Sequence, residues 1–247
     1  MNHEGSNTKR LRGAKLIEQI CQRNQTAQRK RIPKMQKTRK NTIILCLSIA
    51  CIIGLTSLAG LISSIEIVWL RLAAFVVVNL LNGLTAFTAM RLMKMKIYID
   101  FINKRHYLIG CVIALILSLV IAVIPAVCGF SLVGKHTNWS WPTLAFQLLF
   151  CMLIIGPVEE FIFRVYLQDV FVSLFERHPW LGVVIAALLF GLFHLINGNL
   201  IQVLFTFGIG LVFGLAKYRI KDCGYVGVAI GHGLYDFLNV VVRMLIV

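Results

Sequence analysis

Residues 143–167 read TLAFQLLFCMLIIGPVEEFIFRVYL, an apolar run that carries two adjacent glutamates and one arginine. About 20 apolar residues are enough for a helix to cross the roughly 30 Å hydrocarbon core of a bilayer. The run can therefore span a membrane, with Glu159, Glu160 and Arg164 inside it. Charged groups at that depth are costly and usually mark a functional site. We expect function to centre on this helix.

Six further apolar runs predict an all-α protein, a polytopic membrane helical bundle of about seven to eight transmembrane helices. Of the 247 residues, 58% are hydrophobic and 14% are charged, and the mean hydropathy is +0.81. This composition excludes an ordinary soluble domain. The predicted spans cover residues 43–65, 72–90, 107–133, 143–167, 181–197, 200–217 and 224–246. We expect Pro125 and Pro157 to kink their helices or open them locally, because proline lacks the amide hydrogen.

Three regions follow from this division: a basic tail over 1–42, N-terminal transmembrane helices over 43–142, and a catalytic transmembrane core over 143–247. The tail holds 12 of the 25 Lys and Arg residues but only two acids, so it supplies most of the formal charge of +15. We expect it to be disordered or to lie on the membrane surface, where anionic lipid headgroups would bind it. No aromatic residues interleave with its charges, so we expect no nucleic-acid partner.

The loop charges predict the orientation. With the N-terminus inside, 21 Lys and Arg fall on the inner side and three on the outer side. An excess of Lys and Arg is typical of the cytosolic segments of a membrane protein. We therefore expect a multi-pass protein of the cell membrane with a cytosolic N-terminus.

Glycines recur in the last two predicted spans, at Gly208, Gly210 and Gly214 and at Gly224, Gly227, Gly231 and Gly233. Small residues let helix backbones approach each other closely in a membrane. We expect these two helices to pack tightly.

Three predicted spans carry ionisable groups: Glu159, Glu160 and Arg164 on the fourth, His194 on the fifth, and His232 and Asp236 on the seventh. Glu160 and Arg164 are four residues apart on one helix face and can pair, which leaves Glu159 free. His232 and Asp236 share a face in the same way. At a rise of about 1.5 Å per residue, the other four groups lie about 12 to 20 Å from the cytosolic ends of their spans. These groups, Glu159, His194, His232 and Asp236, could therefore lie at a similar depth in the membrane.

A glutamate and two histidines in a water-admitting cavity are what general-base hydrolysis needs. The carboxylate takes a proton from water, and the imidazoles position that water or stabilise the oxyanion. Glu159, His194 and His232 could equally ligate zinc or another divalent metal. Neither a G-x-S-x-G stretch nor an H-E-x-x-H motif is present.

These motifs, E-E-x-x-x-R from Glu159, F-x-x-x-H from Phe190 and H-x-x-x-D from His232, resemble those of the CAAX-protease and bacteriocin-processing family of intramembrane peptidases, also called the Abi family. The resemblance covers roughly residues 143–240. It implies that Glu159 and His194 activate the water and that Glu160 and Arg164 hold the helix geometry. His232 and Asp236 would form the oxyanion or substrate-positioning side, on a membrane-associated peptide or protein substrate.

Asp236 departs from the family pattern, because relatives often have asparagine there. An aspartate cannot donate a hydrogen bond to an oxyanion, so the difference favours a metal-binding or histidine-orienting role.

Two other functions fit the same residues. A non-catalytic bacteriocin-immunity or scaffold protein could keep this bundle and bind a peptide or protein. A transporter could also use buried acids and histidines, although spans one to three offer no inverted-repeat counterpart.

Overall fold

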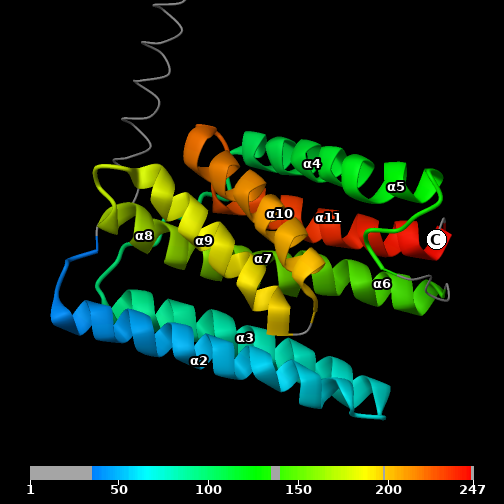
Figure 1. Ribbon diagram of the computed structural model, residues 1–247, viewed down its shortest axis with the longest axis horizontal. Helices are drawn as coiled ribbons and strands as arrows, with labels where there is room; N and C mark the ends of the chain where they lie inside the picture. Colours follow the sequence, from blue (N-terminus) through cyan, green and yellow to red (C-terminus); the bar gives the residue numbers. More distant parts are fainter. Residues whose placement is uncertain (1–34, 135–139, 197, 246–247) are drawn as a thin grey trace, which may run out of the picture. The chain divides into compact units, whose positions relative to one another are not determined.

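The computed structural model describes residues 35–134, 140–196 and 198–245, and every regular element in this part is helical (Figure 1). Six candidate spanning helices are α2 (Arg39–Ser63), α3 (Val68–Leu92), the run from α4 to α5 (Lys104–Val127), α9 with η4 (Pro179–Ile196), α10 (Leu200–Arg219) and α11 (Tyr225–Leu245). The chain is thus a multi-pass helical membrane protein, as predicted. Most of the predicted tail, residues 1–34, lies outside the described part.

The predicted fourth span is present as a continuous helical path of five short pieces. They are α6 (Trp141–Phe150), η2 (Cys151–Ile155), α7 (Gly156–Glu160), η3 (Phe161–Gln168) and α8 (Asp169–Leu174). Because η2 and η3 are π-helical, no single α-helix in this path is long enough to span by itself. By helix length, the described part of the chain has six candidate spans, whereas the sequence predicted seven. The predicted span that is not counted is the α6–α8 path.

Both membrane prolines follow a π-helical turn. Pro157 comes just after η2, and Pro125, in α5 (Ile124–Val127), follows η1 (Leu119–Val123) at the end of α4 (Lys104–Ser118). A proline cannot donate to the carbonyl four residues before it, so the preceding turn widens. The predicted local opening of these helices is confirmed, and π-turns of this kind are frequent at functional sites.

The helices pack as pairs around the α6–α8 path (Figure 1). Helices α2 and α3 are joined by a short turn and lie side by side, as do α9 and α10. Helix α4 lies along α11, although the two are far apart in sequence. The α6–α8 path contacts α3, α9 and α11, and so it lies where these three pairs meet.

The glycines of α10 and α11 do mediate close approaches, mainly with helices other than each other. A Cβ atom on Gly110 of α4 would collide with the Gly227 carbonyl oxygen of α11. On α10, Gly210 faces Ala187 and Phe190 of α9. Glycine spacing therefore predicted tight packing, but it carried no information on which neighbour is packed.

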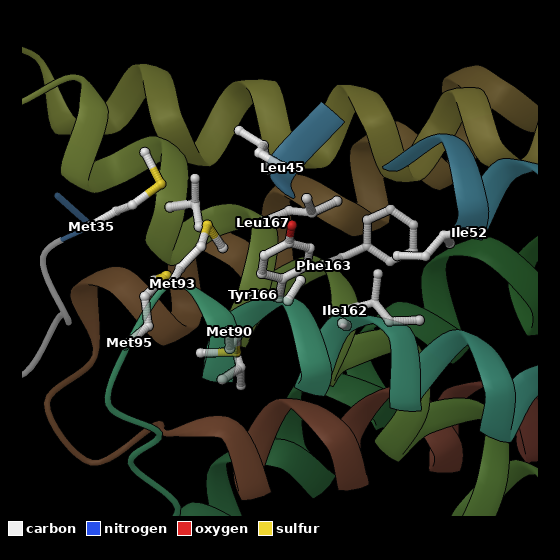
Figure 2. Close-up of a cluster of buried hydrophobic side chains, with 14 of the residues drawn as sticks. Met35, Leu45, Ile52, Met90, Met93, Met95, Ile162, Phe163, Tyr166 and Leu167 are labelled. Carbon is white, nitrogen blue, oxygen red and sulfur yellow. The ribbon is translucent and has the colours of Figure 1, made fainter. Parts of the chain in front are cut away.

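One hydrophobic cluster joins α2 and α3 to the α6–α8 path (Figure 2). Ile52 from α2 and Met90 from α3 are fully buried together with Phe163 of η3. The hydroxyls of Ser48 and Tyr166 are 2.5 Å apart across the same contact. The predicted boundary at residue 142 therefore does not separate two cores, because the N-terminal pair shares its core with the helix that carries the glutamates.

Candidate active site

Glu159 and Glu160 lie on α7, a five-residue α-helical piece between the π-helices η2 and η3. Side chains of neighbouring helices reach two carbonyls of this region. Tyr225 of α11 donates its hydroxyl to the Pro157 carbonyl at 2.9 Å, and Lys217 of α10 donates to the Arg164 carbonyl at 2.7 Å. These contacts fix the segment that presents the two glutamates.

Glu160 and Arg164 form the predicted ion pair, and both side chains are fully buried. The Arg164 Nε atom is 3.0 Å from Glu160 Oε2, and the guanidinium lies 5.0 Å from the centre of the Phe190 ring. A cation over an aromatic face is stabilised by the ring quadrupole. Arg164 is thus held between a carboxylate and a ring, with no route to solvent.

Glu160 also holds His232, a contact that the sequence analysis missed. His232 Nδ1 is 2.9 Å from Glu160 Oε1, and its Nε2 is 3.4 Å from Asp236 Oδ2. The imidazole stacks on Phe213, with ring centres 5.5 Å apart. Both ring nitrogens face carboxylate oxygens, which accept but cannot donate, so each nitrogen is set to donate. The ring is therefore fixed in orientation from three sides.

Glu159 is the partly accessible carboxylate of the cluster, as its helix position predicted. Its side chain is 21% exposed, whereas that of Glu160 is fully buried. Its Oε2 atom lies 3.9 Å from His232 Nε2. On the other side, Glu159 borders a pocket of about 200 Å³ that His194 also lines. Glu159 thus lies between the two histidines.

His194 opens the 3₁₀ turn η4 (His194–Ile196) at the end of α9 (Pro179–Phe193). Its Nδ1 atom is 2.9 Å from the Phe190 carbonyl oxygen. A carbonyl only accepts, so Nδ1 carries the hydrogen and Nε2 offers its lone pair. That is the tautomer suited to accepting a hydrogen bond from water.

Phe190, the first residue of the F-x-x-x-H motif, contacts three residues of the site with its ring. Its ring centre lies 4.8 Å from that of His194 and 5.6 Å from that of His232. It also lies under the Arg164 guanidinium. The spacing of Phe190 and His194 marked Phe190 in the sequence. The contacts of its ring with Arg164 and His232 could not be predicted, because they depend on two other helices.

Two of the helices that wall the pocket beside Glu159, α2 and α3, had no predicted role in the site. Thr56 of α2 and Asn82 of α3 line it, together with Phe193 of α9. His232 and Asp236 do not line this pocket; His232 reaches Glu159 with its Nε2 atom, and Asp236 contacts His232. The site is thus built from six helical segments, α2, α3, the α6–α8 path, α9 with η4, α10 and α11, whereas we expected it to be enclosed by the last four spans.

Gly156 sets the distance between the glutamate helix and α11. A Cβ atom there would collide with the Ala229 carbonyl oxygen and lie 2.6 Å from the Gly233 nitrogen, both backbone atoms of α11. Gly156→Ala should push α7 away from His232 and lower activity about 10²-fold, the cost of roughly 1 Å of misplacement. Gly208→Ala is the matched control, because its Cβ meets nothing within 4 Å. Equal activities of the two variants, measured as kcat/KM, would contradict this account.

Metal binding by Glu159, His194 and His232 is one of two roles that the sequence leaves open. Across residues 35–134, 140–196 and 198–245, no three His, Cys, Asp or Glu side chains are placed to hold a metal ion together. His232 Nδ1 faces Glu160, and His194 lies on the pocket side of Glu159. The residues as arranged therefore do not form a set of three metal ligands.

The part of the chain that carries this site is similar to one known family. Residues 139–238 match a family model described as type II CAAX prenyl endopeptidase Rce1-like. Residues 139–238 are thus similar to this family and form the Rce1-like range of the chain. This match confirms the resemblance drawn from the three motifs, and all six charged or imidazole residues of the site fall inside the matched range. No curated protein and no solved structure matches the chain.

The Rce1-like range does not include α2 and α3. The wall of the pocket that these two helices provide is therefore outside the family match. The fold is that of a multi-pass membrane protein, and its residues 139–238 are similar to the Rce1-like family.

Proposed function

We propose that the protein is an intramembrane endopeptidase that hydrolyses a peptide bond with a water activated by Glu159. The observation that carries the proposal is the position of this carboxylate. It borders the pocket together with His194 and lies 3.9 Å from His232 Nε2 on its other side. An accessible carboxylate beside an imidazole is the arrangement that general-base catalysis requires.

In the first step, a water in the pocket gives a proton to the Glu159 carboxylate while its oxygen attacks the scissile carbonyl carbon. His194 Nε2 accepts the water's other hydrogen as a hydrogen bond and so orients the attack. His232, oriented by Glu160 and Asp236, lies with Nε2 3.9 Å from Glu159 Oε2 and so positions the carboxylate that acts as the base. The C–N bond then breaks, and the proton on Glu159 passes to the leaving amine nitrogen. The products are a free carboxyl and a free amine.

The expected substrate is a membrane-associated peptide or protein. The family description names CAAX prenyl endopeptidases, so a peptide with a prenylated CAAX C-terminus is the first probe to use. Cells that carry the wild type or Glu159→Gln provide an unbiased test by mass spectrometry of their peptide ends. We expect a set of new ends that only the wild type produces. Identical peptide ends, with full biological activity of Glu159→Gln, would instead support the immunity or scaffold function.

Chelation tests the role of a metal. Because no three-donor set is assembled in the described part of the chain, we expect cleavage to persist after treatment with EDTA and 1,10-phenanthroline. The measurement is the rate of cleavage of the prenylated CAAX peptide before and after treatment. Loss of cleavage that added zinc restores would contradict this expectation and assign Glu159, His194 and His232 as ligands.

A further inference from the structure

The pocket beside Glu159 has two kinds of wall. Glu159 and His194 provide the reactive side. The opposite helices, α2 and α3, contribute apolar side chains and a few polar ones, among them Thr56 and Asn82. A peptide in such a pocket has backbone N–H groups that lose their water on entry, and each needs an acceptor.

Asn82 has such an acceptor to offer. The residue is only 6% exposed, although it lines the pocket. Its Nδ2 atom donates to Thr56 Oγ1 at 3.2 Å, which fixes the amide plane. Its Oδ1 atom is buried and has no hydrogen-bond partner in the described part of the chain. Buried acceptors without a partner are rare in folded proteins, and each calls for an explanation.

The other unpartnered polar atoms of the described residues lie elsewhere. Those of Ser118, Gln168, Asn239 and Arg243 belong to residues that do not line this pocket. Those of Glu160 and Arg164 belong to the buried ion pair. Within the described chain, Asn82 is therefore the one pocket residue with a buried acceptor still unused.

We propose that Asn82 is a substrate-positioning residue whose Oδ1 atom accepts a hydrogen bond from a backbone N–H of the bound peptide. The inference rests on the proposed peptidase function and extends it to a helix outside the Rce1-like range. Thr56 holds the amide so that Oδ1 remains available, and Glu159 acts on the same occupant from the other wall. Recognition of a backbone N–H fixes the peptide without selecting its side chains.

Kinetics of two variants test this role. Asn82→Leu removes both polar atoms but keeps the branching and the number of side-chain heavy atoms, and Asn82→Ala removes the whole amide. We expect each to raise KM for a prenylated CAAX peptide about 5- to 10-fold, the value of one hydrogen bond, with kcat nearly unchanged. Thr85→Ala is the matched control on the same helix, because its hydroxyl bonds only the Leu81 carbonyl and Cys51, and it does not line the pocket.

A modified substrate separates binding from a structural effect. Replacing one peptide N–H near the scissile bond with an ester oxygen removes the donor from the substrate. For one ester position, we expect the wild type to lose about 5- to 10-fold in KM, whereas Asn82→Leu should lose nothing more. A residue that only packed α3 against α2 would not show this dependence on a substrate atom.

The outcomes are distinct. An unchanged KM in both Asn82 variants, a lowered melting temperature alone, or a fall in kcat at constant KM overturns the assignment of Asn82 while leaving the peptidase intact. Additive effects of the ester and the substitution also overturn it. No cleavage by the wild type, of the prenylated CAAX probe or of any cellular peptide, overturns the proposed function and this inference with it.

Discussion

Glu159→Gln is expected to lower kcat about 10²- to 10⁴-fold, with little change in KM. Glutamine keeps the shape of the side chain but cannot take a proton from water. Glu159 is partly exposed, and its closest charged contact, His232, keeps its Asp236 and Glu160 partners after the substitution. The variant should therefore fold normally. The measurement is steady-state cleavage of a prenylated CAAX peptide by purified protein in liposomes.

The matched control is Glu176→Gln, the same substitution at a carboxylate that is 59% exposed and only 3.6 Å from an equally exposed Lys37. It should cleave at the wild-type rate. If Glu159→Gln kept more than about a tenth of the wild-type kcat, the carboxylate would not be the base.

Arg164→Leu is expected to destabilise the protein by about 3 to 5 kcal/mol, because it removes one partner of a fully buried ion pair. Glu160 would then have only His232 to balance its charge. The measurement is thermal unfolding in detergent. Arg105→Leu is the control, since its Nη1 atom is also 3.0 Å from a carboxylate, that of Asp222, but its side chain is 77% exposed. We expect that change to cost at most about 1 kcal/mol.

Combining Arg164→Leu with Glu160→Gln separates stability from activity. The double variant leaves no buried carboxylate without a cation, so part of the stability should return. Activity should stay low, because His232 Nδ1 loses the carboxylate that orients it. An Arg164→Leu protein as stable as the wild type, or an active double variant, would contradict the role given to this pair.

Local spacing predicted the part of the site that depends on one helix. Residues four apart share a face, so the sequence indicated the pairing of Glu160 with Arg164 and of His232 with Asp236, and the separate position of Glu159. The structure brings both pairs within contact distance. Pro157 similarly predicted a local opening beside the glutamates, where η2 now lies.

Contacts between helices could not be predicted in the same way. That Glu160 binds His232 depends on how α7 packs on α11, and nothing in either motif states this. Phe190 acquires its role only because Arg164 and His232 come to it from two other helices. The role proposed for Asn82 could not be predicted from the sequence, because its relation to Glu159 depends on the packing of α3 against the glutamate helix.

Cleavage in water enriched in ¹⁸O tests the central claim most directly. Purified wild-type protein in liposomes is incubated with a prenylated CAAX peptide, and the products are analysed by mass spectrometry. If water attacks the scissile carbonyl, the new carboxyl group should contain one solvent oxygen, and Glu159→Gln should yield no such product. A product without solvent oxygen, or equal labelled cleavage by Glu159→Gln, would contradict hydrolysis by a Glu159-activated water.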